Sequence, residues 1–189
     1  MSLFQNIVII LVLIAGAGFL SLTEIALAGA RKVKLKILAE SGDDRAQKVL
    51  NLQENSADFF AASQIGLNAV AILGGILGEG AFRPYFMSFV ARFYTGPWSE
   101  TISFALSFTL VTSLFILFAD LMPKRLAMIA PEKISIAVIN PIQVFIKVCK
   151  PLAWIINALA NLLFRLFKVN TTRDAVSYTH LTLPTNREV

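Results

Sequence analysis

The sequence predicts an all-α membrane protein with three transmembrane helices and a juxtamembrane belt of amphipathic helices on the cytoplasmic side. Hydrophobic residues make up 56% of the 189 residues and charged residues only 15%, whereas an average soluble domain has roughly 25% charged residues. Three apolar segments reach the length of about 20 residues that a helix needs to cross the hydrocarbon. The remaining apolar stretches are shorter and lie among basic residues.

The composition also excludes several classes of protein. A soluble chain of this size cannot bury so much apolar surface, and a disordered chain would be polar and rich in charge. The single cysteine, Cys149, excludes a disulfide framework and a cysteine-based zinc site. The single histidine, His180, leaves little for histidine-based catalysis. We therefore do not expect an enzyme.

The three predicted spans cover about residues 3–30, 58–80 and 100–122. The first carries one charge, Glu24, and the other two carry charges only at or near their ends. A cleaved signal peptide is the alternative for the first span. That alternative fits poorly, because no basic segment precedes the apolar run and the run is too long.

Residues 34–54 predict an amphipathic helical hairpin. Leucine, alanine and valine alternate there with charged residues at helical spacing, and Ser41-Gly42 interrupts the pattern. We expect this hairpin to pack on the inner membrane face.

Residues 132–168 predict short juxtamembrane helices that lie in the membrane interface. Their apolar stretches are too short to span, and prolines recur every ten residues and interrupt any longer helix. These prolines are Pro131, Pro141 and Pro151. A re-entrant pair of helices or a fourth span is the alternative for this region.

The orientation follows from the lysine and arginine residues near the ends of the spans. Six lie between the first two spans: Arg31, Lys32, Lys34, Lys36, Arg45 and Lys48. The connection between the second and third spans has only Arg83 and Arg92. We therefore expect the N-terminus outside and the basic regions in the cytoplasm. The net charge of +5 then reflects topology and affinity for anionic lipid, and nucleic acid is not an expected partner.

Polar residues inside the spans form a candidate ion site, because each is costly in lipid. They are Ser21, Thr23 and Glu24 in the first span, Gln64 and Asn68 in the second, and Asp120 in the third. At about 1.5 Å rise per residue, they fall in the inner half of the bilayer. Carboxylate, amide and hydroxyl oxygens suit Mg²⁺ or Ca²⁺. The alternative is that the carboxylates pair with basic residues, for example Asp120 with Lys124.

Glycine and proline give two further expectations. Gly74 and Gly78 permit close approach of another helix, which is either a homodimer seam or packing within the chain. Pro123 is expected to break the third span at the cytoplasmic surface, and to free backbone carbonyls near Asp120.

Three motifs resemble those of the CorC/CNNM (cyclin M) family, in its order and spacing, over about residues 3–168. They are residues 21–27 (SLTEIAL), residues 64–73 (QIGLNAVAIL) and residues 119–127 (ADLMPKRLA). The resemblance is closest to the bacterial hemolysin-C-like branch of the family.

The resemblance implies a dimeric transmembrane domain, in the bacterial inner membrane, that exports magnesium in exchange for sodium. Mg²⁺ would be the transported ion and Na⁺ the coupling ion. The implied metal-site residues are Ser21, Thr23, Glu24, Gly66, Asn68 and Asp120. The alternative function is a non-transporting membrane anchor that dimerises cytoplasmic regulatory modules.

Three residues depart from the family pattern. Asp120 replaces the usual glutamate, which keeps the charge but shortens the reach by one methylene. Ala119 replaces a glycine, and Ala71 stands where many members have a second asparagine. Since Mg²⁺ requires near-ideal geometry, these changes leave the identity of the transported ion open.

We assign residues 1–170 to the transmembrane domain and residues 171–189 to an unstructured tail. The resemblance implies that nucleotide-binding CBS modules follow in the full-length protein. Residues 175–189 match no family pattern and look like translated sequencing-adapter sequence, so we expect them to be non-native. A genuine divergent tail is the alternative.

Overall fold

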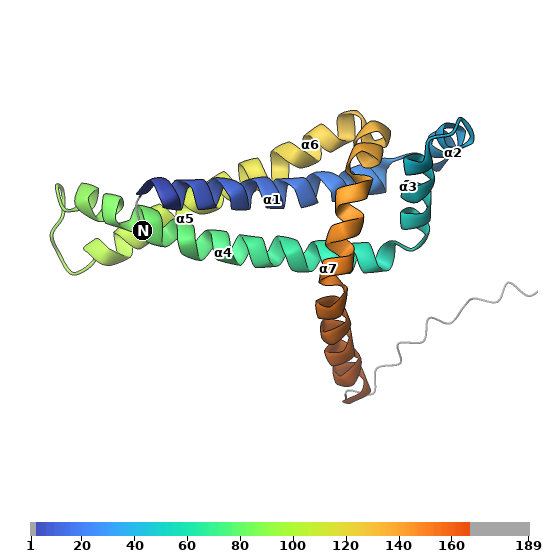
Figure 1. Cartoon of the computed structure of the whole chain (residues 1–189). Helices are drawn as coiled ribbons and strands as arrows, with labels where there is room; N and C mark the ends of the chain where they lie inside the picture. The colour runs from blue at the N-terminus through green and yellow to red at the C-terminus, as the bar shows by residue number, and fades with distance from the viewer. Residues whose placement is uncertain (1–2, 167–189) are drawn as a thin grey trace, which may run out of the picture. The chain divides into compact units, whose positions relative to one another are not determined.

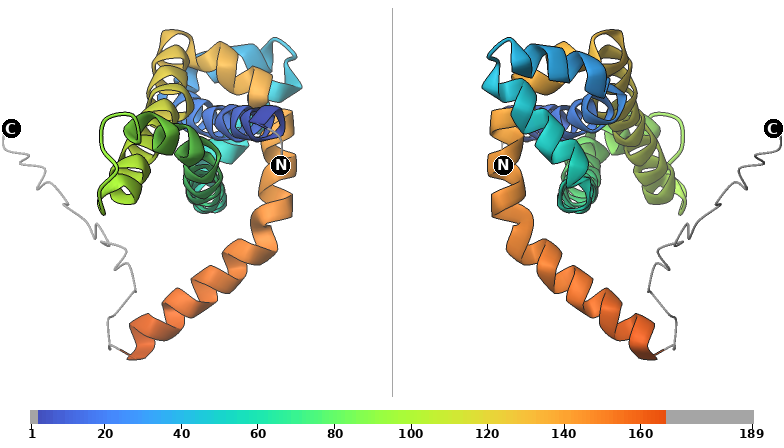
Figure 2. Two further views of the ribbon diagram at one scale, coloured as in Figure 1. Left: turned by 90° about the vertical axis from the view of Figure 1, so that its left-hand side faces the viewer. Right: turned by 90° about the vertical axis from the view of Figure 1, so that its right-hand side faces the viewer.

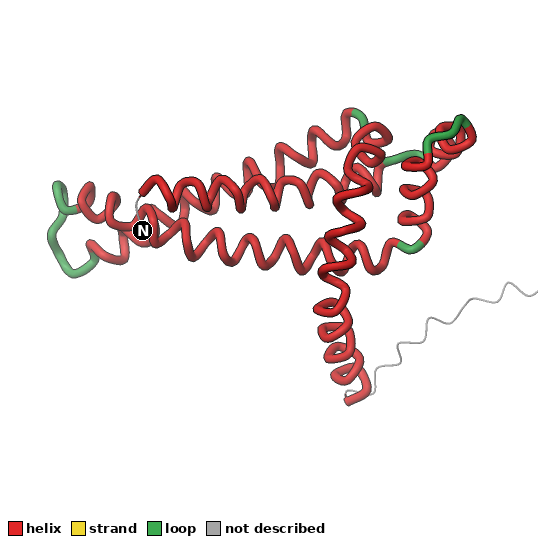
Figure 3. The backbone as a smooth tube through the Cα atoms, viewed as in Figure 1, coloured by secondary structure: helices red, strands yellow, loops and turns green. Residues whose placement is uncertain are grey.

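The computed structural model describes residues 3–166, and these residues are helical apart from short connections, with no strand (Figure 3). The predicted all-α class is therefore confirmed. The predicted tail, residues 171–189, lies outside the described residues. The chain divides into two units, Met1–Ala153 and Trp154–Val189, and the packing described below is that of the first unit.

Four helical stretches among the described residues are long and apolar enough to cross a membrane. They are Phe4–Gly29, Ser56–Val90, Ser99–Ile129 and Pro131–Ile156. The first nearly coincides with the predicted span at residues 3–30, and the next two contain those predicted at 58–80 and 100–122. The fourth falls in the region for which short helices were expected.

The first three of these stretches pack side by side. Helix α1 (Leu3–Gly29) lies along α4 (Ser56–Val90), and α4 lies along α5 (Ser99–Leu114) (Figure 1). In Figure 2, which views the helices end-on, α4 lies beside both α1 and α5. Much of their apolar surface is exposed in the isolated chain, including Leu11 and Ile72, which is typical of helices that face lipid.

Helix α4 is longer than the span predicted at residues 58–80. It continues to Val90 with Pro84 inside it, so the connection to α5 is shorter than expected. The added turns persist because Ala81 and Val90 are buried against the bundle. The hydroxyl of Ser88 also donates to the carbonyl of Pro84 at 3.0 Å.

Helix α7 (Pro131–Leu166) contradicts the expected series of short helices. It is a single helical element with Pro141 and Pro151 inside it. A proline removes one backbone donor and crowds the preceding turn, so it can bend a helix without ending it. Burial of Ile139 and Ile142 holds the segment around Pro141 in place.

The third span does not end at Pro123. After α5 the chain passes into a π-helical segment, η1 (Phe115–Leu121), and then into α6 (Met122–Ile129) without a break. The N–H of Met122 bonds the carbonyl of Leu117, five residues earlier. Pro123 then stands in the first turn of α6, directly after the π-helical segment.

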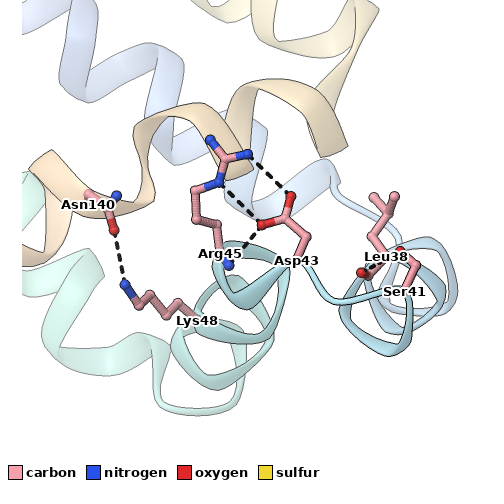
Figure 4. A network of polar contacts seen from close by, with 6 residues as sticks. All are labelled: Leu38, Ser41, Asp43, Arg45, Lys48 and Asn140. Atoms are coloured by element: carbon pink, nitrogen blue, oxygen red, sulfur yellow. Dashed lines mark hydrogen bonds and ion pairs between the residues drawn. The ribbon is translucent and has the colours of Figure 1, made fainter.

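The predicted hairpin is confirmed as a pair of helices, α2 (Lys32–Glu40) and α3 (Asp44–Glu54). Gly42 lies at the turn with φ +97°, a conformation that disfavours residues with a side chain. The carboxylate of Asp43 accepts from the N–H of Arg45 at 3.0 Å and caps α3 (Figure 4). The side-chain hydrogen bond from Arg45, together with its backbone N–H, lowers the pKa of Asp43.

The main apolar core lies where the bundle meets the hairpin (Figure 1). It joins the second half of α1, both hairpin helices, the start of α4 and the start of α7. Its buried members are Leu20, Leu27, Ala30, Leu35, Ala46, Val49, Leu50, Phe59, Ile136, Ile139 and Ile142. The hairpin is therefore part of the fold rather than an appendage.

Polar contacts connect the same elements. The amide of Gln53 donates to the carbonyls of Leu27 and Ala30, at 2.7 and 2.9 Å. These carbonyls at the C-terminal end of α1 thus gain a hydrogen-bond donor from outside the helix. Arg31 donates to Glu132 at 3.0 Å and so links the end of α1 to the start of α7.

Gly74 and Gly78 pack within the chain. A Cβ at Gly74 would collide with the ring of Phe115, and one at Gly78 would collide with Val111. These glycines let α5 and η1 approach α4 closely, as small residues do between membrane helices. Packing within the chain, one of the two expectations for these glycines, is therefore present at this face.

Candidate cation-binding cavity

A cavity of about 340 Å³ lies between α1, α4 and the η1–α6 segment. Its polar lining comes from Ser21, Glu24, Gln64, Asn68, Asp120 and Lys124. Apolar residues, among them Leu67, Phe115 and Ile116, form the rest of the wall. Residues that are far apart in the sequence thus converge on one space.

Helical spacing explains why these side chains face the same space. Ser21 and Glu24 are three residues apart on α1, and Gln64 and Asn68 are four residues apart on α4, so each pair shares a helix face. Four of the six predicted site residues line the cavity: Ser21, Glu24, Asn68 and Asp120.

Asp120 has the best-defined contacts in the cavity. Its Oδ1 accepts from the hydroxyl of Ser21 at 3.3 Å and lies 2.5 Å from Nζ of Lys124. The Asp120–Lys124 pair that the sequence offered as an alternative to an ion site is thus present. The pair does not stand apart from the cavity, since Lys124 also lines it.

Thr23 does not line the cavity. Its side chain is fully buried, and its hydroxyl donates to the carbonyl of Phe19 at 2.7 Å within α1. This is the usual way in which a threonine inside a helix satisfies its hydroxyl.

Gly66 also lies outside the cavity. A Cβ at this position would be 2.7 Å from the ring of Phe145 and 2.8 Å from Leu20. Gly66 therefore permits close packing of α4 against α1 and α7. It supports the cavity by setting the distance between helices.

The π-helical turn determines where Asp120 stands. Because η1 carries wider turns than an α-helix, it shifts the register of the residues that follow it. Gly18 of α1 packs close to this turn, since a Cβ there would be 3.2 Å from Pro123 and 3.3 Å from the carbonyl of Phe118. A larger residue at position 18 would move α1 away from Asp120.

Three contributors to the cavity are missing from the metal-site residues that the family resemblance implies. Gln64 was recognised as a polar residue in a span, and its spacing of four from Asn68 was the signal that it shares the cavity. Lys124 was considered only as a competing partner of Asp120. The part played by Gly18 has no signal in the sequence, because it depends on the path of η1.

The carboxylates of the cavity are few. Among the described residues, no group of three or more His, Cys, Asp or Glu side chains gathers closely enough to hold a metal ion. The cavity brings together two carboxylates, those of Glu24 and Asp120, with neutral oxygens and one ammonium.

Comparison with known proteins identifies the family. Residues 8–183 match the family described as "Cyclin M transmembrane N-terminal domain". The chain is 54% identical over 171 residues to "Polyamine export protein" of Escherichia coli (strain K12), an alignment that covers 90% of this chain and 38% of that protein. It is 44% identical over 174 residues to "Polyamine export protein" of Haemophilus influenzae, covering 92% of this chain and 40% of that protein.

A more distant relative is "UPF0053 protein sll0260" of Synechocystis, 30% identical over 167 residues, covering 88% of this chain and 37% of that protein. The chain thus spans well under half the length of these curated relatives. With the family match covering most of the sequence, the chain belongs to the cyclin M transmembrane-domain family.

Proposed function

We propose that the chain is the membrane-embedded part of a polyamine exporter, and that the cargo binds in the cavity at Asp120. The observation that carries the proposal is the contact of Asp120 with a primary ammonium, that of Lys124, at 2.5 Å. Carboxylates suit the ammonium groups of a polyamine, and the apolar wall suits its methylene segments. The names of the E. coli and H. influenzae relatives support the same substrate class.

Sodium-coupled export of magnesium is the second candidate. The resemblance to the CorC/CNNM family implies it, and the hard oxygens of Ser21, Asn68 and Asp120 favour it. Against it, Mg²⁺ requires near-octahedral ligands at about 2.1 Å, and the ammonium of Lys124 already contacts the central carboxylate.

We propose the following arrangement in the bacterial inner membrane. Helices α1, α4 and the α5–η1–α6 stretch span the bilayer with the N-terminus outside. The hairpin and α7 form the belt at the inner face. The excess of lysine and arginine between α1 and α4 supports this orientation.

The assembly is also a proposal. Residues 1–170 form the transmembrane domain, CBS modules follow it in the full-length protein, and two copies dimerise through a face other than Gly74 and Gly78. The function we propose is transport and not catalysis, as the names of the export-protein relatives suggest.

Proteoliposomes containing the full-length parent protein test these alternatives. They are loaded with spermidine or with Mg²⁺, and efflux is followed with and without an inward sodium gradient. Efflux of spermidine supports the proposal. Sodium-driven efflux of Mg²⁺ alone favours the second candidate, and no efflux of either cation favours the non-transporting anchor.

A further inference from the structure

Lys124 occupies the place that a substrate ammonium takes under the proposed function, on which this inference rests. Its Nζ lies 2.5 Å from Oδ1 of Asp120, and its side chain lines the same cavity as Ser21 and Asn68. We propose that Lys124 is a tethered competitor of the exported cation. Its ammonium binds Asp120 while the cavity is empty and leaves when the cargo binds.

The pair is free to separate. The side chain of Lys124 is 34% exposed and that of Asp120 is 47% exposed, and a lysine reaches its partner through a flexible four-carbon stem. The ion pairs of Glu132 differ, because that carboxylate is only 12% exposed and both Arg31 and Lys34 hold it. The first arrangement permits exchange, whereas the second fixes two helices.

The helix geometry keeps the competitor within reach. Asp120 and Lys124 are four residues apart on the continuous helix that runs from η1 into α6, so their side chains remain neighbours. The ammonium can leave Asp120 and return to it without any movement of the backbone. Exchange therefore needs only a change of lysine rotamer.

The ammonium of Lys124 stabilises the empty site electrostatically. A carboxylate without a partner is costly in a membrane-embedded site, and Lys124 neutralises Asp120 when no cargo is present. The cargo then replaces one charge-assisted hydrogen bond with another of the same kind. The net affinity of the cargo for the site is therefore lower than it would be for a carboxylate without a partner. Lower affinity favours release, and a transport site must bind weakly enough to let its cargo leave.

Exchange also favours cargo with a primary ammonium. Such a group presents the same charge and the same N–H donors to Asp120 as Lys124 does. The hydroxyl of Ser21, which donates to the same oxygen, can keep its hydrogen bond throughout. Lys124 is therefore a residue that determines which cations the proposed transport site accepts.

The test is calorimetric titration of the detergent-purified chain with spermidine. Lys124→Met removes the competing charge and is expected to lower the Kd on the order of tenfold, a coupling of ordinary size. Lys124→Arg keeps a tethered cation and should retain the weak affinity. Arg125→Met is the matched control, because Arg125 is the adjacent basic residue, is exposed and does not line the cavity.

A double-mutant cycle makes the test specific. In an Asp120→Asn background, Lys124→Met is expected to bring no gain in affinity, since the carboxylate that both cations share is gone. Lys124→Gln serves as a second neutral variant that keeps a hydrogen-bond donor beside Asp120, and it should tighten binding like Lys124→Met.

The outcomes separate this inference from the proposed function. Wild-type binding of spermidine with equal or weaker binding by both neutral variants overturns the inference and leaves the proposed function standing. A chain that folds only with a cation at position 124 makes the pair structural and also overturns the inference. Absence of wild-type binding overturns the proposed substrate, and the inference with it.

Discussion

Ser21 and Thr23 lie two residues apart on α1, and their hydroxyls have different partners. Ser21 donates across the bundle to Asp120, whereas Thr23 donates to Phe19 of its own helix. The family resemblance implies that both hydroxyls belong to the ion site. Of the two, only Ser21 lines the cavity.

Substitution of the two hydroxyls distinguishes these interpretations. We expect Ser21→Ala to raise the Kd for cargo roughly threefold to tenfold, the loss of one hydrogen bond of ordinary net strength. Thr23→Val, which keeps the shape of the side chain, should leave the Kd unchanged. Calorimetric titration measures both, and a larger loss for Thr23→Val than for Ser21→Ala would contradict the assignment.

At this scale the sequence singled out most of the polar residues that meet in the cavity, but not which side chains face it. The cost of polar groups in lipid singled out Ser21, Glu24, Asn68 and Asp120, and the cavity brings them together. The same argument could not separate a residue that faces the cavity, such as Ser21, from one that bonds its own helix, such as Thr23. That difference depends on the rotation of α1 about its axis, which packing determines.

At the scale of elements, the contact between α4 and η1 controls the shape of the cavity. Gly74 receives the ring of Phe115, and Phe115 in turn lines the cavity. The neighbouring Gly75 has no atom within 4 Å of the position of its Cβ. The two glycines thus differ in packing although they are adjacent.

Alanine substitution of this pair is a matched test. Gly74→Ala is expected to destabilise the fold by about 1–3 kcal/mol through overpacking, and to weaken cargo binding by moving Phe115. Gly75→Ala should be neutral or stabilise the helix by up to about 1 kcal/mol. Unfolding in denaturing detergent gives the stabilities, and equal effects at the two positions would contradict the packing described.

The cap of α3 predicts a dependence on pH. The hydrogen bonds and charge of Arg45 lower the pKa of Asp43, so the folded state prefers the carboxylate. This contribution to stability is present above the unfolded pKa of about 3.9, and it is lost as the pH falls through the lower folded pKa.

Amide hydrogen exchange in residues 44–54, corrected for intrinsic rates, measures this effect. We expect these amides to exchange faster as the pH falls through the pKa of Asp43. Asp43→Asn is the control, because asparagine caps a helix about as well as aspartate but does not titrate. An equal pH dependence in both proteins would show that other groups are responsible.

Prolines were the main source of error at the scale of elements. The sequence rule that proline ends a helix fails at Pro123, Pro141 and Pro151, all of which lie within helical stretches. In α7, long-range burial compensates for the two backbone hydrogen bonds that Pro141 and Pro151 remove. At Pro123, the change of register in η1 accommodates the proline. Neither effect can be read from local sequence.

At the scale of the whole molecule, the number of membrane spans depends on whether α7 crosses the bilayer. Pro131–Ile156 is long and apolar enough to cross a membrane, but our proposal places α7 in the belt. A belt puts both ends of α7 on the cytoplasmic side, and a fourth span puts them on opposite sides.

Cysteine labelling decides between the two arrangements. In a Cys149→Ala background, single cysteines replace Lys133 and Leu166 near the two ends of α7. We expect an impermeant maleimide to label both in inverted vesicles and neither in right-side-out vesicles. Labelling of the two positions from opposite sides would establish a fourth span and refute the belt.

The overall class could be predicted from the sequence because composition and hydropathy are properties of the whole chain. The hairpin was predictable too, since its amphipathic pattern and Ser41-Gly42 are local signals. Contacts between distant residues determine the extent of α4, the continuity of α7 and the neighbour of Gly74. Only the structure shows these contacts.

Export by proteoliposomes containing the full-length parent protein shows whether cargo binds at Asp120, as we claim. Initial rates of spermidine efflux are compared for wild type, Asp120→Asn and Asp58→Asn. The control, Asp58, is exposed, pairs with Lys150 at 4.0 Å and lies outside the cavity. Asp120→Asn is expected to lower the rate by at least about tenfold, the loss of a hydrogen-bonded charge, and Asp58→Asn should retain the wild-type rate. Export at the wild-type rate by Asp120→Asn would contradict the claim.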